Sequence, residues 1–317
     1  MFNEFVLTEH QQIEKAARAL REGSLVAFPT ETVYGLGADI SRIDAVERIF
    51  EVKGRPKNHP LIVHISNLET IGEIAEVEKE IIGELIGFWP GPLTLVLRKS
   101  DLVDQIVTGG QDSIAIRIPR HPVAISLLNT FHSLGGLGIA APSANRYGKT
   151  SPTRAQDVLH DIGSFLDKND FILDGGQSEC GLESTILDLT GEIPTIRRLG
   201  SITLKEITEI LGTVELDLTG QAGRISGSEQ SHYAPSARVH MKVGELTSGG
   251  FVAMNSIPTP KEFVRIAAPK SLEEYAHVLY QSFREADNLS LKDLVVIAPE
   301  GDGLADAIRD RIWRASS

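Results

Sequence analysis

Apolar positions in the first two thirds of the chain follow helical and strand-like spacings in turn. Thr8 and Gln11 form a capping box, and the apolar stripe behind them predicts a helix that ends at Gly23. The same spacing predicts further helices over 44–53, after 65 to about 88, from 151 onward and over 203–212. Thr203 with Glu206 is expected to cap the last of these helices. Short apolar runs predict strands over 24–28, 61–65, 94–97, 113–118, 137–141, 171–173, 184–189 and 194–198. Because the last two strands form a hairpin at Thr190-Gly191, a mixed twisted sheet is favoured over a purely parallel one.

The pattern changes after Gly212. Residues 213–236 are rich in Gly, Ser and Thr and carry no apolar stripe, which is typical of a linker. Beyond them a small α/β unit is predicted, with strands over 238–243, 250–254, 264–267 and 294–298 and helices over 271–283 and 303–315. The chain therefore divides into a domain over 1–212, a linker over 213–236 and a small domain over 237–317.

Composition narrows the classes of protein that fit this organisation. A chain of 317 residues with 41% apolar content can bury two cores, and its single cysteine, Cys180, cannot form an internal disulfide. No cationic leader or apolar stretch of about 20 residues is present, so neither secretion nor a membrane span is expected and a cytoplasmic location is favoured. A net charge of −12 argues against a broad nucleic-acid-binding surface, because phosphate backbones bind clustered Lys and Arg.

Three polar segments follow predicted strands or helices of the first domain. They are Pro29 to Gly37, Lys53-Gly54-Arg55, and Ala141 to Asn145, read in the sequence as PTETVYGLG, KGR and APSAN. Each segment alone is also typical of an ordinary cap or turn, but together they place hydroxyls, an amide and two cations on neighbouring loops. This combination predicts a site for an anionic ligand.

Other kinds of site fit the sequence poorly. Residues 143–150 have the spacing of a phosphate-binding P-loop, but Ser143 stands where the motif needs glycine for its tight turn. The histidines show no helical metal-binding pair, and no serine sits in a nucleophile elbow, so neither a metal site nor a Ser-His-Asp triad is expected. Cys180 is interpreted as a buried small side chain rather than a nucleophile.

The three segments resemble the YrdC-like domain, and most closely that of the threonylcarbamoyl-AMP synthases. The resemblance covers about 5–212, and the linker with the small domain is similar to the longer, two-domain branch of that family. It implies a twisted mixed-sheet domain followed by a small Rossmann-like α/β domain. It also implies a cytoplasmic enzyme that converts L-threonine, bicarbonate and ATP into an activated intermediate for tRNA threonylcarbamoyl-transfer machinery.

The resemblance also assigns residues to the substrates. Around L-threonine it places Thr32, His64, Arg117, Ala141 and Ser184. Around ATP it places Lys53, Arg55, His59, Ser113, Ser143, Asn145, Ser151, Arg198 and Tyr233. Lys53 and Arg55 are expected to be catalytic through their charge, since nucleotidyl transfer needs positioning and charge stabilisation. Mg²⁺ is expected to accompany ATP, with no dedicated protein site for the metal.

Two departures from the family pattern bear on these assignments. His59 stands where the family carries Asn, and 226–231 read SGSEQS in place of a Pro-Gly-Met stretch. Tyr233 is retained, so the linker is expected to act as a lid over the occupied site, with a passive tether as the alternative. A non-enzymatic RNA-binding regulator and a carbamoyltransferase remain the rival functions. Direct RNA binding is expected to be weak.

Overall fold

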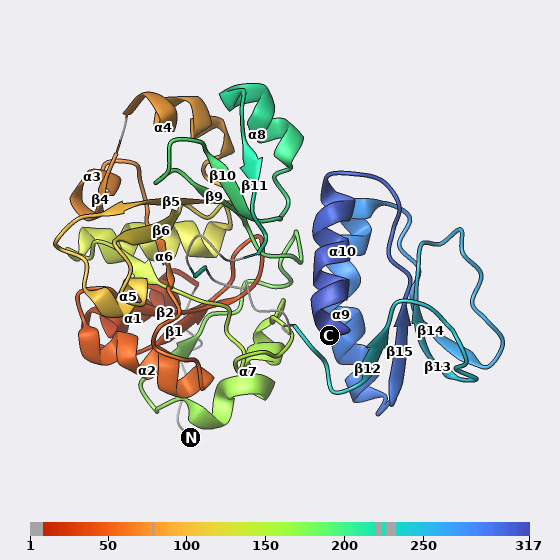
Figure 1. Ribbon diagram of the computed structural model, residues 1–317. Helices are drawn as coiled ribbons and strands as arrows, with labels where there is room; N and C mark the ends of the chain where they lie inside the picture. The colour runs from red at the N-terminus through yellow and green to blue at the C-terminus, as the bar shows by residue number, and fades with distance from the viewer. Residues whose placement is uncertain (1–8, 78, 220–223, 226–232) are drawn as a thin grey trace, which may run out of the picture.

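The computed structural model describes residues 9–77, 79–219, 224–225 and 233–317. It contains two β-sheets with helices packed around them. One sheet has eleven strands and the other has four. Helices α9 (Leu272–Asn288) and α10 (Leu304–Ala315) stand between the four-stranded sheet and the larger body of the molecule (Figure 1). These two helices carry hydrogen bonds to the large unit, among them those of Arg284 and Arg311.

The eleven-stranded sheet is mixed, as the sequence predicts. Its order is β11-β10-β9-β5-β6-β3-β7-β2-β1-β8, with β4 paired to β5. Its strands are β1 (Val26–Phe28), β2 (Gly35–Asp39), β3 (Ile62–His64), β4 (Ala75–Glu76), β5 (Leu93–Lys99), β6 (Ser113–Arg117), β7 (Ile139–Ala140), β8 (Phe171–Ile172), β9 (Thr185–Asp188), β10 (Thr195–Arg198) and β11 (Glu215–Leu216). The β9–β10 pair is antiparallel, which confirms the predicted hairpin, whereas β3 and β6 run parallel.

Helices cover this sheet and connect its strands. They are α1 (Glu9–Arg21), α2 (Ile43–Lys53), α3 (Ile71–Ile74), α4 (Lys79–Leu85), α5 (Gln105–Thr108), α6 (Pro122–Ser133), α7 (Ala155–Ile162) and α8 (Leu204–Leu211), with 3₁₀ turns η1 (Ile86–Phe88) and η2 (Gly163–Phe165). The capping box of Thr203 and Glu206 on α8 is confirmed, while Thr8 lies outside the described residues. Within the described ranges, no helix is both long and apolar enough to cross a membrane.

Strand β2 is an element that the hydrophobic pattern does not predict. Its sequence contains Gly35 and Gly37, and glycine is depleted in strands because it has no side chain to pack. In the fold, the missing side chain is needed. A Cβ on Gly37 would lie 2.7 Å from Ile139 and 2.9 Å from Phe28. The glycines therefore allow β2 to fit closely between β1 and β7, and this places the Pro29–Tyr34 loop beside the ends of the sheet strands.

Other differences lie outside β2, including the short helix α5 and strand β11, which are not predicted. Helix α6 is not predicted, although it buries Val123, Leu127 and Phe131 at helical spacing behind an N-terminal proline. The single helical stretch expected up to Phe88 is divided into α3, β4, α4 and η1. The interruption arises because β4 pairs with β5, so a tertiary contact overrides the local pattern.

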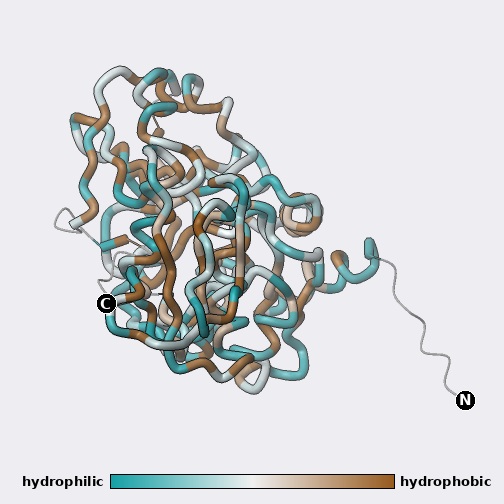
Figure 2. The backbone as a smooth tube through the Cα atoms, turned by 90° about the vertical axis from the view of Figure 1, so that its right-hand side faces the viewer, coloured by the Kyte–Doolittle hydropathy of each residue, from teal (hydrophilic) through white to brown (hydrophobic). Residues whose placement is uncertain are grey.

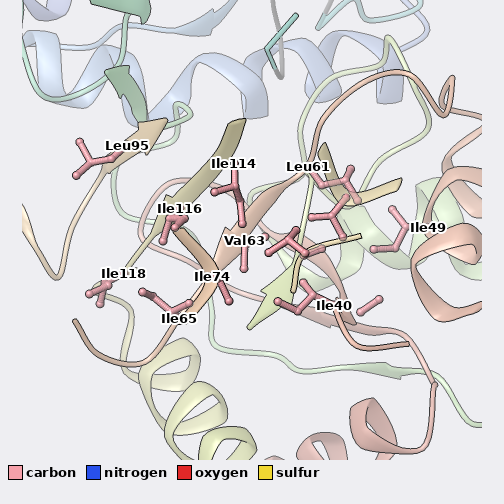
Figure 3. Packing of buried hydrophobic residues seen from close by; sticks show 14 of the residues in the cluster. Ile40, Ile49, Leu61, Val63, Ile65, Ile74, Leu95, Ile114, Ile116 and Ile118 are labelled. Atoms are coloured by element: carbon pink, nitrogen blue, oxygen red, sulfur yellow. The ribbon is translucent and has the colours of Figure 1, made fainter. Parts of the chain in front are cut away.

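The main core consists of branched aliphatic side chains on the central strands. Val63 on β3, Leu95 on β5 and Ile116 on β6 pack with Ile49 of α2 and Ile74 of α3 (Figure 3). Each of these side chains is at most 1% exposed. Burial of one such side chain contributes about 1.5–3 kcal/mol, so the strand ends that carry the polar segments rest on a rigid base.

The four-stranded sheet is entirely parallel, in agreement with a Rossmann-like small unit. Its order is β12-β15-β13-β14. The strands are β12 (Arg238–His240), β13 (Gly249–Val252), β14 (Phe263–Ala267) and β15 (Asp293–Val296). Hydrophobic residues run along these strands and hydrophilic ones along the outer loops (Figure 2). Leu279 and Phe283 of α9 close the core against the sheet.

The predicted linker over 213–236 is described only in part. Strand β11 pairs with β10, and Ile225 is buried against Ile62, Val96 and Ile186 of the large sheet. Residues 220–223 and 226–232 lie outside the described residues, so the lid role of the whole segment stays a prediction. The described parts show that the chain follows the large unit before it enters the small one.

Candidate active site

The polar segments meet in one pocket beside the ends of the short central strands. It is lined by Thr30, Thr32, Val33, Tyr34, Gly35, Arg55, Ile62, His64, Arg117, Ala141, Pro142, Ser143, Glu183, Ser184, Arg198 and Tyr233. All the residues assigned to L-threonine are in this set. Of those assigned to ATP, the lining includes Arg55, Ser143, Arg198 and Tyr233. Residues that are far apart in the sequence therefore share one site.

Arg117 lies at the end of β6 and is already engaged by protein groups. Its Nη1 donates to Thr32 Oγ1 at 2.7 Å, its Nε donates to Gly91 O at 3.2 Å, and its Nη2 lies 2.7 Å from Glu31 Oε1. Burial would raise the pKa of Glu31, but the charge of Arg117 and its hydrogen bond lower that pKa below its usual value. A direct fork from Arg117 onto a substrate carboxylate therefore requires one of these partners to give way.

His64, at the end of β3, supplies a neutral imidazole to the pocket. Burial, with a smaller contribution from the nearby Arg117 cation, lowers the pKa of His64 to about 3. The ring is 3% exposed and meets Phe28 edge to face at 5.8 Å. Its Nδ1 is buried with no hydrogen-bond partner among the described residues. Such an imidazole can orient a polar ligand by hydrogen bonding without adding charge to the site.

The Lys53-Gly54-Arg55 turn sends its two cations to different places. Gly54 ends α2 in the left-handed conformation with φ 62°, which lets the chain turn sharply between the two residues. Arg55 lines the pocket, donates to Pro60 O at 3.1 Å and lies over the Tyr147 ring at 5.7 Å. Lys53 is 2% exposed, and its Nζ donates to the backbone oxygens of Ser143 at 2.5 Å and Asn145 at 2.6 Å.

The assignment of Lys53 to the nucleotide phosphates therefore does not match its placement. Its ammonium binds the backbone of the 143–145 loop and is absent from the pocket lining. Sequence spacing could not reveal this, because the carbonyls that attract Nζ come from residues 90 and 92 positions away. Lys53 acts on the site by fixing the loop that presents Ser143.

Arg198, the last residue of β10, is hydrogen-bonded to Ser184, which directly precedes β9. Arg198 donates from Nε to Ser184 O and from Nη2 to Ser184 Oγ, both at 3.0 Å. The Ser184 hydroxyl also lies 2.7 Å from Thr94 Oγ1. Arg198 is 6% exposed, so its charge acts in a region largely closed to water, where electrostatic interactions are strong.

The remaining residues assigned to ATP stand behind or beside the pocket. Asn145 Nδ2 donates to the backbone oxygens of Arg146 and Lys149 at 2.8 and 2.6 Å, which makes it a structural amide of the loop. Ser151 donates to Glu183 Oε1 at 2.6 Å. His59 meets the Tyr147 ring edge to face at 5.6 Å, one ring away from Arg55. Ser113 lies at the start of β6, in a separate small cavity beside Ile225.

Glu183 is the functional residue that sequence reasoning misses. It directly precedes Ser184, lines the pocket and accepts hydrogen bonds from Ser151, Tyr280 and Arg311. The one signal in the sequence is an acidic side chain next to a predicted ligand-binding serine. Only the fold reveals its hydrogen-bond partners, two of which, Tyr280 and Arg311, lie in the small unit.

The carboxylate of Glu183 makes stability depend on pH with a definite sign. Burial would raise its pKa, but Arg311, Arg198 and the Ser151 hydroxyl lower it from 4.5 to about 2. Because the folded form binds its proton less readily than the unfolded form, the stabilisation is complete above about pH 4.5 and is lost as pH falls toward 2.

We expect Glu183→Gln to flatten the fall in the free energy of unfolding across this window, measured by urea denaturation. The exposed Glu179→Gln is the control, and a wild-type slope in Glu183→Gln would contradict the expectation.

The described residues contain no group of three or more His, Cys, Asp or Glu side chains placed to hold a metal ion. The carboxylates nearest the pocket are both engaged, Glu31 with Arg117 and Glu183 with Arg311. These donor sets do not fit a resident divalent cation, since hard cations need several available oxygen ligands. The arrangement suits a ligand that brings its own negative charge.

Comparison with known proteins finds two family models that match successive parts of the chain. A family model described as "Telomere recombination" (Sua5, YciO and YrdC) matches residues 18–200, and one described as "Threonylcarbamoyl-AMP synthase, C-terminal domain" matches residues 202–317. The threonylcarbamoyl-AMP synthase of Pyrococcus abyssi is 38% identical over 97% of this chain and 95% of its own length. That of Bacillus subtilis is 38% identical over 98% and 94%, respectively.

A solved structure extends the likeness to three dimensions. The crystal structure of P. abyssi Sua5 complexed with L-threonine superimposes with a TM-score of 0.87 at 37% sequence identity. The match covers 98% of this chain and 95% of that one, so both units and their order are shared. With both family segments present and relatives aligned over nearly its whole length, this chain belongs to the threonylcarbamoyl-AMP synthase family.

Proposed function

We propose that this protein is an L-threonylcarbamoyladenylate synthase. The enzyme makes threonylcarbamoyl-AMP and pyrophosphate from L-threonine, bicarbonate and ATP, and the product serves N6-threonylcarbamoyladenosine modification of tRNA. The observation that carries the proposal is the convergence of Arg55, Arg117 and Arg198 on a pocket that also holds hydroxyls and a neutral imidazole. Three guanidinium groups suit polyphosphate and carboxylate, and the hydroxyls suit an amino acid.

L-threonine is assigned to the part of the pocket that contains Thr32, His64, Ala141 and Ser184. The hydroxyls of Thr32 and Ser184 are oriented by Arg117 and Arg198, respectively, so they have defined directions before the substrate arrives. The buried Nδ1 of His64 offers one more polar group to a ligand. Preorganised partners of this kind lower the cost of orienting a small substrate.

ATP is assigned to the part that contains Arg55, Ser143, Arg198 and Tyr233. The two arginines would neutralise charge on the phosphates as it shifts toward the leaving pyrophosphate. Mg²⁺ would enter bound to the triphosphate as part of the substrate, in keeping with the engaged carboxylates of the pocket. Tyr233 lines this part of the pocket and would place an aromatic side chain beside the nucleotide.

The proposed reaction has two steps. The threonine amine attacks bicarbonate and forms N-carboxythreonine, with loss of water. A carboxylate oxygen of that carbamate then attacks the α-phosphorus of ATP. The bond between the α-phosphorus and the oxygen that bridges it to the β-phosphorus breaks, and pyrophosphate leaves with that oxygen. No protein nucleophile is needed, so the residues of the pocket bind, orient and stabilise charge.

The test is pyrophosphate release by the purified full chain with each substrate omitted in turn. The proposal expects release only when ATP, L-threonine and bicarbonate are present together. Turnover with carbamoyl phosphate in place of bicarbonate would favour a carbamoyltransferase. Tight, salt-resistant tRNA binding without any threonine-dependent turnover would favour an RNA-binding regulator, because non-specific affinity for phosphate backbones falls steeply with salt.

A further inference from the structure

The small unit reaches into the candidate active site through one buried ion pair. Helices α9 and α10 face the large unit (Figure 1), and they carry Tyr280 and Arg311. Arg311 is 0% exposed, and its Nε donates to Glu183 Oε2 at 2.9 Å. Glu183 lines the pocket, so a residue in the last helix lies one side chain away from the site.

Glu183 gathers groups from both units. Its Oε1 accepts from Ser151 Oγ at 2.6 Å, and its Oε2 accepts from Tyr280 Oη at 2.9 Å as well as from Arg311. Arg311 is fixed in turn, because its Nη2 donates to Leu199 O at 2.8 Å and its Nη1 to Asp310 Oδ2 at 2.5 Å. Rotation of any one of these side chains would disturb the rest.

The ring of Tyr233 packs against Arg311 and Tyr280, the same two residues of the small unit that bind Glu183. The guanidinium carbon of Arg311 lies 5.1 Å from the centre of the Tyr233 ring, within cation–π range. The Tyr280 ring stacks on Tyr233 at 5.6 Å with an interplanar angle of 25°. The backbone of Tyr233 is held by Thr150, whose Oγ1 donates to Tyr233 O at 3.0 Å. Tyr233 is 1% exposed and lines the pocket.

Stability alone is a weak reason for this arrangement. Desolvation of two buried charges costs free energy that their attraction only partly returns, so an apolar pair often holds two units together as well. The contacts of Arg311 are better suited to positioning the groups that it binds, because a planar guanidinium fixes the direction of each of its donors. The two groups so placed, Ser151 and Tyr233, are both residues assigned to the nucleotide.

We infer that Arg311 is a positioning residue for the synthase reaction, which sets Glu183, Ser151 and Tyr233 in place on the nucleotide side of the pocket. The inference rests on the proposed function. It gives the small unit a defined task, since Arg311 of α10 contacts both Glu183 and Tyr233 of the pocket lining. It does not extend to the threonine side, where Thr32, His64 and Ala141 contact neither Arg311 nor Tyr280 in any hydrogen bond of the described residues.

The experiment compares Arg311→Lys with the matched control Arg309→Lys. Arg309 lies on the same helix, donates from Nη1 to Pro299 O at 2.9 Å within the small unit and is absent from the pocket lining. Lysine keeps the positive charge at 311 but cannot lie flat on Tyr233 while it donates to Glu183 and Leu199. KM for ATP, KM for L-threonine, kcat and the melting curve are measured on the full chain.

For Arg311→Lys we expect KM for ATP to rise about tenfold or more, since a displacement near 1 Å has effects of this order or larger. KM for L-threonine should change by less than about twofold, and Arg309→Lys should match the wild type in both constants. A purely structural role would lower the active fraction and leave both KM values unchanged, which would overturn the inference.

If Arg311→Lys does not fold, the variant Tyr280→Phe decides, because it removes only the hydroxyl that donates to Glu183. A raised KM for ATP in Tyr280→Phe supports the inference, and an unchanged KM overturns it. Absence of threonine-dependent turnover in the wild type would instead overturn the proposed function.

Discussion

Replacement of Lys53 by methionine is expected to lower the free energy of unfolding by about 2–5 kcal/mol and to remove most of the activity. The Lys53 ammonium is buried and donates to two backbone oxygens of the 143–145 loop. Without it, those carbonyls lose charged donors in a region that water cannot readily reach, and each loss costs about 1–3 kcal/mol. The loop that carries Ser143 would then shift, so substrate placement suffers together with stability.

The control for Lys53→Met is Lys57→Met, four positions along the chain. Lys57 pairs with Glu47 at 2.6 Å, but the two side chains are 55% and 43% exposed, so the pair contributes less than about 1 kcal/mol. Both variants are measured by urea denaturation and by pyrophosphate release. A Lys53→Met protein with wild-type stability and a raised KM for ATP alone would return Lys53 to the role of phosphate ligand.

Conversion of Arg198 to lysine is expected to lower kcat/KM for L-threonine by about 100-fold, equivalent to about 2.7 kcal/mol of transition-state stabilisation. The planar guanidinium of Arg198 donates to both the carbonyl oxygen and the hydroxyl of Ser184. A lysine ammonium can reach one of these oxygens but cannot reproduce the fork. The Ser184 hydroxyl would therefore lose its fixed direction toward the substrate.

The adjacent Arg197→Lys is the matched control for this change. Arg197 is also buried, at 4% exposure, but it pairs with Asp188 at 2.9 Å and Asp217 at 3.5 Å and does not line the pocket. Its variant is expected to lose stability while it retains most of its activity. Steady-state kinetics and melting curves separate the two effects, and equal losses of kcat/KM in both variants would show that Arg198 acts only through the fold.

Local structure and the position of the pocket follow in large part from short-range patterns. The Thr203–Glu206 capping box, the β9–β10 hairpin and the small α/β unit are all predicted and all observed. These features depend on interactions within a few residues or on strong apolar periodicity, which a single sequence displays directly. The three polar segments are also predicted to form one site, and the pocket brings members of all three together.

Roles of individual side chains follow less directly. Lys53 and Arg55 are two residues apart and are both cations, yet one binds loop carbonyls and the other lines the pocket. Arg117 is predicted to lie around L-threonine, and the structure already pairs it with Glu31 and bonds it to Thr32. A buried guanidinium or ammonium must satisfy its donors, and the nearest acceptors are set by the fold rather than by sequence spacing.

The sequence by itself thus determined the mixed-sheet unit, the small α/β unit and the set of polar segments that form the pocket. Only the tertiary structure decided which charges face that pocket and which support it. Glu183 shows the reason most clearly, because its partner Arg311 is 128 positions away in the chain. Desolvation makes each buried charge depend on a partner in space, and that partner can come from any element that the fold brings near.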